Sequence, residues 1–189
     1  MKSLRHNKGY TLIELLVALI ISGILTTAAY SFYVRMHNQT LTQQEISDMQ
    51  TISRNSIQEL TQTLRKAGFK LSGHAPYHFS NDTLWVFFSE TQPVDTVIYY
   101  LSDYTEPELL HISHLDDGHL PKKLMRKVNS GTPAVYADLI SSISYSAPTA
   151  TSVEVTLVTQ VSEADEDFTQ NAGVRTNVVT ERVTLRNVY

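Results

Sequence analysis

The chain has 189 residues, a hydrophobic content of 42%, a net charge of −4 and no cysteine. This hydrophobic content is too high for a disordered tail and is enough to build a core. The absence of cysteine excludes disulfides, thiolate zinc sites and cysteine nucleophiles together. The acidic balance argues against general nucleic-acid binding, because phosphate contacts need an excess of lysine and arginine.

A basic leader opens the chain and precedes a long apolar segment. The leader ends at Gly9, and the sequence Tyr10-Thr11-Leu12-Ile13-Glu14 follows. The next 20 residues, Leu15–Val34, carry no charge. In a helix they span about 30 Å, which is the thickness of the hydrocarbon core of a membrane. The carboxylate of Glu14 is costly at the mouth of such a segment, so it requires a partner.

The distribution of charge predicts the orientation of the apolar segment. Lys2, Arg5 and Lys8 precede it, whereas Arg35 alone follows it closely. The positive-inside bias places the N-terminus in the cytoplasm and the rest of the chain on the other side. Without the leader, 12 basic and 19 acidic residues would remain, which is a net charge of −7.

The sequence predicts one long helix at the N-terminus. Residues 12–66 contain no proline and a single glycine, Gly23, so nothing in them stops a helix. Their first half is apolar all round, and their second half is amphipathic. The apolar positions of the second half are Ile46, Met49, Ile52, Ile57, Leu60 and Leu64. Gly68 is expected to end the helix.

Strand patterns follow the predicted helix. Six segments are rich in β-branched and aromatic residues: Thr83–Ser89, Thr96–Leu101, Glu108–Ser113, Leu139–Tyr145, Ser152–Thr159 and Val178–Arg186. Lys123–Val128 is compatible with a short strand or a helical turn, and a hairpin turn is expected around Ala147-Pro148-Thr149. A helix followed by strands with short connections predicts an α+β fold, in which the amphipathic half of the helix packs on an antiparallel sheet.

The segment Lys8-Gly9-Tyr10-Thr11-Leu12-Ile13-Glu14-Leu15 resembles the class III signal of type IV pilins and type II secretion pseudopilins. The resemblance implies that a prepilin peptidase cuts between Gly9 and Tyr10 and methylates the new amine of Tyr10. It implies that Glu14, the fifth mature residue, acts in assembly. It also implies three parts: a leader peptide at 1–9, a transmembrane and assembly helix at 10–34, and a periplasmic pilin-like domain at 35–189.

Two shorter matches suggest a type of pilin. Leu64-Arg65-Lys66-Ala67-Gly68-Phe69 resembles a segment of PilW-type minor pilins, and Val183-Thr184-Leu185-Arg186-Asn187 resembles their closing strand. The closing strand is similar in J-type minor pseudopilins of type II secretion systems. Major pilins of Gram-negative bacteria commonly carry a disulfide loop, so a chain without cysteine fits a minor subunit better.

The resemblance implies a structural subunit rather than an enzyme. A minor pilin enters the bacterial inner membrane as a single-pass protein, is trimmed and methylated, and then joins the fibre. Its implied partners are the prepilin peptidase, other major and minor pilins or pseudopilins, and the inner-membrane assembly platform, without a small-molecule substrate. A minor pseudopilin is the nearest alternative, and a tip module that binds DNA or a surface is a third.

Glu14 and Gly23 are the two positions of the apolar segment that suggest a role. Cleavage at Gly9 frees a cationic amine on Tyr10, which can meet the Glu14 carboxylate of an axially offset neighbour and so set the register. Gly23 is either a point of helix softening or a close contact with a neighbouring helix. The hydroxyl groups of Ser22, Thr26 and Thr27 are expected to bond back to the helix backbone.

Three other groups of residues were weighed as sites. A metal cluster is a weak hypothesis for residues that occupy a strand and a turn, namely His111, His114, Asp116, Asp117 and His119. Calcium is the only cofactor considered, for the acidic loop with Glu163, Asp165, Glu166 and Asp167. A basic cluster, Lys122, Lys123, Arg126 and Lys127, suits DNA or an acidic subunit. No catalytic constellation or phosphate-binding loop stands out.

Overall fold

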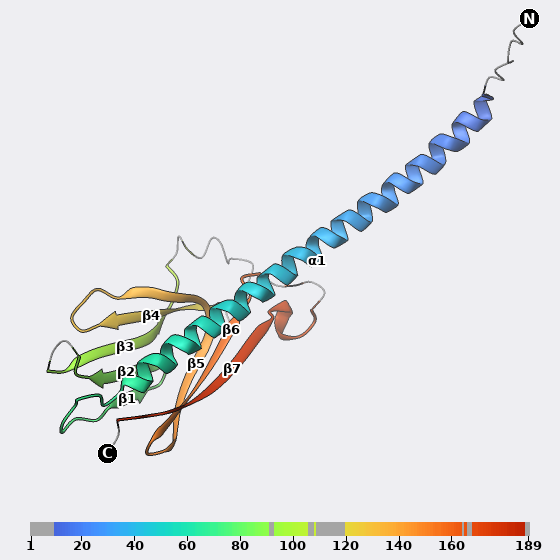
Figure 1. Ribbon diagram of the computed structural model, residues 1–189. Helices are drawn as coiled ribbons and strands as arrows, with labels where there is room; N and C mark the ends of the chain where they lie inside the picture. The colour runs from blue at the N-terminus through green and yellow to red at the C-terminus, as the bar shows by residue number, and fades with distance from the viewer. Residues whose placement is uncertain are drawn as a thin grey trace, which may run out of the picture. The chain divides into compact units, whose positions relative to one another are not determined.

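The computed structural model describes residues 10–90, 93–105, 108, 120–163, 165 and 168–187. They form a long helix, a short 3-10 helix and an antiparallel sheet with the strand order β1-β2-β3-β4-β5-β6-β7 (Figure 1). The elements are α1 (Leu12–Lys66), β1 (Tyr77–Ser80), β2 (Thr83–Phe88), β3 (Asp95–Ser102), β4 (Lys122–Val128), β5 (Ala134–Thr149), β6 (Ser152–Gln160), η2 (Asn171–Gly173) and β7 (Thr176–Thr184). The predicted α+β class and the bounds of the long helix are confirmed.

Contacts divide the described residues into two compact units, one up to Gln43 and one from Gln44 onward. The first unit holds the apolar part of α1. The second holds the rest of α1 and the whole sheet. The boundary falls inside the helix, nine residues after the apolar segment ends at Val34 and just before the first apolar positions of the amphipathic half.

The sheet agrees with most of the predicted strands and corrects three details. Lys122–Val128 is a strand, and β1 and the first residues of β5 were not predicted. The expected turn at residues 147–149 is wrong, because β5 continues to Thr149 and the chain reverses before Ser152. Pro148 fits there because the ladder with β6 is interrupted between Ser146 and Thr149. The expected strand at 108–113 lies outside the described residues beyond position 108.

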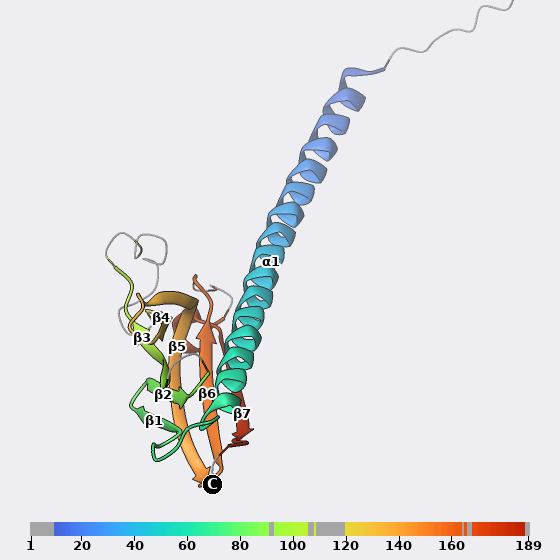
Figure 2. The same cartoon turned by 60° about the vertical axis from the view of Figure 1, so that its left-hand side comes forward.

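The core lies between the second half of α1 and the inner face of the sheet, which Figure 2 shows side by side. Leu60 and Leu64 have no exposed surface, and Ile57 is 9% exposed. They pack on alternate residues of the strands: Leu84, Val86, Val97, Tyr99, Leu124, Ile140, Val153, Val155, Leu157 and Val183. The amphipathic pattern of the helix is therefore confirmed. A smaller cluster joins Met49 to Val161 and Val174.

The hydroxyl of buried Tyr99 links the sheet to the helix inside this core. The Tyr99 hydroxyl on β3 lies 2.9 Å from Thr63 Oγ1 and donates to Glu59 Oε1 at 2.9 Å, and both residues belong to α1. Arg126 on β4 lies 3.3 Å from the same carboxylate oxygen. Burial raises the pKa of Tyr99 to about 12, so the phenol keeps its proton. These contacts fix α1 on the β3–β4 part of the sheet in a single position.

The end of α1 meets the end of the chain. Gly68 has a left-handed φ of +76° just after the last helical residue, which is the conformation expected of a helix stop. The Asn187 side-chain amide donates to the carbonyl oxygens of Arg65 and Ala67, each at 3.4 Å. The Asn187 main chain lies so close to Gly68 that a Cβ there would overlap it. The two short segments that resemble PilW-type pilins therefore contact each other.

We predict that Gly68→Ala destabilises the second unit by more than about 2 kcal/mol, since it combines a left-handed φ with a steric overlap. Gly73→Ala is the matched control, because Gly73 has a φ of +74° but open space around the added methyl group. The control is expected to cost about 1 kcal/mol. Denaturant unfolding followed by the fluorescence of Trp85, the single tryptophan, measures both. Equal losses would contradict the role of the Asn187 contact.

Candidate functional site

The start of α1 forms a reciprocal cap between Thr11 and Glu14. Glu14 Oε2 accepts hydrogen bonds from the Thr11 N–H at 2.9 Å and from the Thr11 hydroxyl at 2.8 Å. In return, the Glu14 N–H donates to Thr11 Oγ1 at 3.3 Å. This arrangement is a capping box, in which Thr11 is the N-cap and Glu14 the third helical residue. It satisfies main-chain donors that a helix in an apolar medium would otherwise leave without partners.

Thr11 was not singled out from the sequence, although its signal was present. A threonine three residues before a glutamate, ahead of an apolar run, is a helix-start pattern. The sequence interpretation instead assigned Glu14 to a partner in another subunit. In the structure, one oxygen of Glu14 is used within its own helix. The other oxygen, Oε1, has no hydrogen-bond partner among the described residues.

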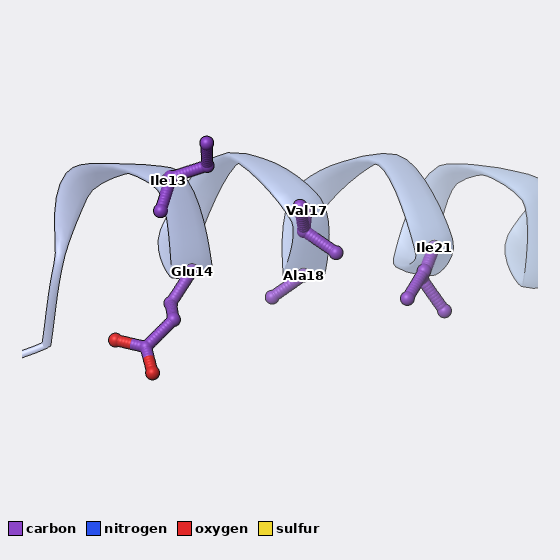
Figure 3. A pocket seen from close by; sticks show the side chains of 5 residues that line it. All are labelled: Ile13, Glu14, Val17, Ala18 and Ile21. Carbon is purple, nitrogen blue, oxygen red and sulfur yellow. The ribbon is translucent and has the colours of Figure 1, made fainter.

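Glu14 stands on an apolar surface. Figure 3 shows its carboxylate projecting from the helix on the same side as Ala18, in a shallow hollow lined by Ile13, Val17, Ala18 and Ile21. Tyr10, which precedes the cap, is 91% exposed and lies outside the helix. The geometry therefore presents one charged group, with one oxygen available, at the start of the apolar half of α1.

The first half of α1 exposes an unusual amount of apolar surface. Its large apolar side chains from Leu12 to Leu25 are between 48% and 84% exposed. The helix contains a window with a mean hydropathy of 2.2, so it is long and apolar enough to cross a membrane. A continuous surface of this kind requires cover by lipid or by other helices.

Three hydroxyl groups inside this apolar segment are satisfied within the helix, whereas the Ser22 hydroxyl makes no hydrogen bond with a described residue. The hydroxyls of Thr26, Thr27 and Ser31 donate to the carbonyl oxygens four residues earlier, at 2.8–2.9 Å. This confirms the back-bonding expected of Thr26 and Thr27 and makes the segment compatible with a medium without water. Gly23 has no atom near its missing side chain, so its surface is open to a neighbouring helix, as one of its two predicted roles requires.

The basic cluster on β4 is largely paired with carboxylates. Lys122 lies 3.6 Å from Asp103, Lys123 lies 2.7 Å from Glu108, and Arg126 lies 3.3 Å from Glu59 at a partly exposed position. The hydrogen bonds from Lys123 and from Thr105 lower the pKa of Glu108 to about 2. Lys127 makes no ion pair with a described residue. This pairing leaves little free positive charge for DNA.

Asp165 of the acidic loop forms an ion pair with Arg175. Arg175 lies 2.7 Å from Asp165 Oδ2 and stacks on the ring of Phe168, with its guanidinium carbon 4.5 Å from the ring centre. Burial, followed by the charge of Glu163, raises the pKa of Glu45 on the adjacent part of α1.

No group of three or more metal-ligating side chains is found within the described ranges. The whole predicted metal cluster, His111, His114, Asp116, Asp117 and His119, lies outside the described residues. Glu166 and Asp167 of the predicted calcium site also lie outside them. Gly9, on the leader side of the predicted cut, also lies outside them.

Comparison with protein families identifies the start of the chain. Residues 4–30 match the family model described as the prokaryotic N-terminal methylation motif. The chain therefore carries a prokaryotic methylation motif. The motif supports a protein of the type IV pilin-like superfamily in general, either a pilin or a pseudopilin, and such proteins are structural. It implies processing by a prepilin peptidase and assembly with other pilins. No curated protein and no solved structure matches the chain significantly.

We predict that Thr11→Val loosens the first turn of α1, because it removes the hydroxyl from both sides of the cap. The expected loss is about 1 kcal/mol, which corresponds to roughly fivefold faster amide hydrogen exchange of Glu14, whose N–H donates to the Thr11 hydroxyl, in detergent micelles. Thr11→Ser retains the hydroxyl and is expected to exchange like the parent chain. Unchanged exchange in the valine variant would contradict a functioning cap.

Proposed function

We propose that the chain is a minor type IV pilin that helps to initiate or assemble a pilus after leader cleavage and N-methylation. The observation that carries this proposal is the position of Glu14. It lies at the start of an exposed apolar helix, directly inside a methylation motif, and keeps one carboxylate oxygen available. In this proposal the chain first spans the inner membrane with its N-terminus in the cytoplasm and its sheet domain in the periplasm.

The local structure suits cleavage between Gly9 and Tyr10. Peptide groups inside a helix are hydrogen-bonded within that helix. Tyr10 and Thr11 precede the first helical residue, Leu12, so they lie outside it. Hydrolysis of the bond leaves a carboxylate on Gly9 and a free amine on Tyr10. Methylation of that amine keeps its positive charge and its ability to donate a hydrogen bond.

The amine and Glu14 then form the proposed contact between subunits. Glu14 Oε2 remains in the cap with Thr11, and Oε1 accepts from the Tyr10 amine of a neighbour. Removing an amine and a carboxylate from water is costly separately and tolerable as a pair. The pair therefore selects the axial register of two helices more than it adds net stability.

The exposed apolar surface of α1 supports the same function. In the membrane, lipid covers the side chains from Leu12 to Leu25. In a fibre, the same side chains pack against those of other subunits, so the helix leaves lipid without exposing them to water. The sheet domain stays outside this helical core.

The nearest alternative is a minor pseudopilin of a type II secretion system. The observation that favours it is the closing segment Val183–Asn187, which resembles that of J-type pseudopilins and holds the end of α1 through Asn187. The fibre subunits recovered with the native chain distinguish the two assemblies, since they are either pilins or pseudopilins. Genes beside that of this chain give an independent answer.

We predict that the mature protein begins at Tyr10 and carries one added methyl group. Intact-mass analysis of the chain from its native host measures both changes at once. A host without the prepilin peptidase is the control and is expected to retain residues 1–9. An uncut chain in the normal host would contradict the proposed function.

We also predict that Glu14→Gln is cleaved normally but enters fibres about tenfold less than the parent, because a buried amine loses its counter-charge. Glutamine still accepts the hydrogen bonds of Thr11, so this variant separates charge from capping. Glu154→Gln on the sheet is the matched control, since it removes a carboxylate far along the chain. Immunoblots of purified fibres and of membranes give the ratio. Normal incorporation of Glu14→Gln would rule out the pairing.

A further inference from the structure

The last strand, β7, forms a long open edge of the sheet. It pairs with β6 over nine consecutive positions, from Thr176 to Thr184, without a register shift. Its other side has no neighbouring strand in the described part of the chain. Open edges attract further strands, and proteins usually blunt them with proline, lysine, bulges or short length. β7, whose sequence is TNVVTERVT, has nine residues and contains no proline, lysine or bulge. Charged side chains also blunt edges, and β7 has two of them, Glu181 and Arg182, whereas its residues 176–180 are uncharged.

The hydrogen-bond pattern shows which main-chain groups face outward. The N–H of Leu185 donates to the Thr151 oxygen, and the N–H of Val161 donates to the Arg175 oxygen. Both bonds lie in the register of β6 and β7. Because bonded and non-bonded pairs alternate in an antiparallel ladder, the odd-numbered residues of β7 bond to β6. The even-numbered residues direct their N–H and C=O groups outward.

These outward groups have no hydrogen-bond partner in the described part of the chain. Among the described residues, none donates to or accepts from the main chain of Val178, Thr180 or Arg182. All three residues are exposed, and Val178 is 60% exposed. Both ends of the strand are fixed by the two bonds at Arg175 and Leu185. The edge is therefore preformed rather than created by binding.

The opposite edge of the sheet is different. β1 has only four residues and follows Pro76. The Phe87 N–H donates to the Pro76 oxygen, which by the same alternation leaves only Tyr77 and Phe79 with outward groups. β1 is too short to pair with the whole length of β7 in a second copy of the chain. The asymmetry indicates that β7 is the edge available for pairing.

We propose that β7 docks an extended segment of another protein of the fibre assembly, which adds a strand to the sheet. Main-chain groups supply most of the recognition, as in other cases of strand addition. Side chains add selectivity: the cross-strand pair of half-buried Val158 and exposed Val178 suits an apolar residue, and Glu181 suits a cationic one, since it makes no ion pair with a described residue. The partner is therefore an extended peptide with an apolar and a basic residue on opposite faces.

A second copy of this chain fits β7 less well than another protein. An antiparallel β7–β7 sheet with α1 on the same face in both copies would run the two helices in opposite directions. The proposed fibre keeps its N-terminal helices parallel, and the inference depends on the proposed function in this respect. Pairing of β7 with β1 would leave most of the nine-residue edge unfilled.

The first test measures the free edge in the full chain in detergent. Amide hydrogen exchange is expected to be at least about tenfold faster at Val178, Thr180 and Arg182 than at Val179 and Glu181, because only the odd-numbered amides are bonded to β6. Equal protection at all five positions would show that the chain covers its own edge and would overturn the inference.

The second test identifies the partner by periodicity. The chain has no cysteine, so a single introduced cysteine can be labelled with a benzophenone photo-cross-linker at one site. Three such variants are examined in the native host: Val178→Cys, Thr180→Cys and Arg182→Cys. Paired strands predict that the cross-linked residues move along one partner segment in steps of two. Ser144→Cys, exposed on the central strand β5, is the control. Scattered links, links no stronger than the control, or links to a second copy would overturn the inference.

The third test separates the edge from the fold. Thr180→Pro removes one outward N–H and no bond to β6, so the domain is expected to unfold at the same denaturant concentration as Thr180→Ala. Cross-linking from position 178 is expected to fall about tenfold in the proline variant only. If the proline variant does not fold, Val178→Pro with cross-linking from position 182 replaces it. Unchanged cross-linking in a folded proline variant contradicts strand addition.

These outcomes are distinguishable from failure of the proposed function. A chain that is cut before Tyr10 and methylated, but shows no periodic cross-links, contradicts strand addition alone. An uncut chain contradicts the proposed function, and its amide exchange still decides whether the β7 edge is open.

Discussion

Leu60 and Leu64 have no contact with solvent because the second half of α1 lies against the inner face of the sheet. Each strand contributes alternate residues to this contact, so the sheet has one face available for the helix and one for solvent. At the same place, Tyr99 connects the helix to β3 and β4 through hydrogen bonds. Burial supplies the stability, and the polar contacts select one position of the helix among those that burial alone would permit.

The first half of the same helix is exposed and apolar, and its first turn shows how its polar groups find partners in such a segment. A helix that starts at the edge of a membrane has main-chain donors without partners and, here, a carboxylate without a counter-ion. The reciprocal contacts of Thr11 and Glu14 address the first problem within the chain. The second problem is left open, because only one oxygen of Glu14 is used. In the proposed function, a neighbouring subunit supplies the missing partner of this carboxylate.

The sheet presents different chemistry along its outer face and edges. By strand alternation, the outer face of β2 and β3 carries Trp85, Phe87 and Ile98, whereas the outer face of β5 carries a run of serines. The edge at β1 is short, and the edge at β7 is long and regular. The proposed packing through the N-terminal helix would thus leave a separate main-chain surface for the proposed strand addition. The two contacts use unrelated physics, since one buries apolar side chains and the other pairs main-chain groups.

Local patterns in the sequence determined the helix, its end at Gly68, most strands and the identity of Glu14 as a special position, because periodicity and glycine conformations act over a few residues. The tertiary structure alone decided the pairing of β6 with β7, the overlap of Asn187 with Gly68 and the engagement of the basic residues by carboxylates. It also decided the bulge in β5, where Leu139 adopts a left-handed φ of +55° and bonds the Tyr104 hydroxyl. These features join residues that are far apart in the chain, so no local pattern records them.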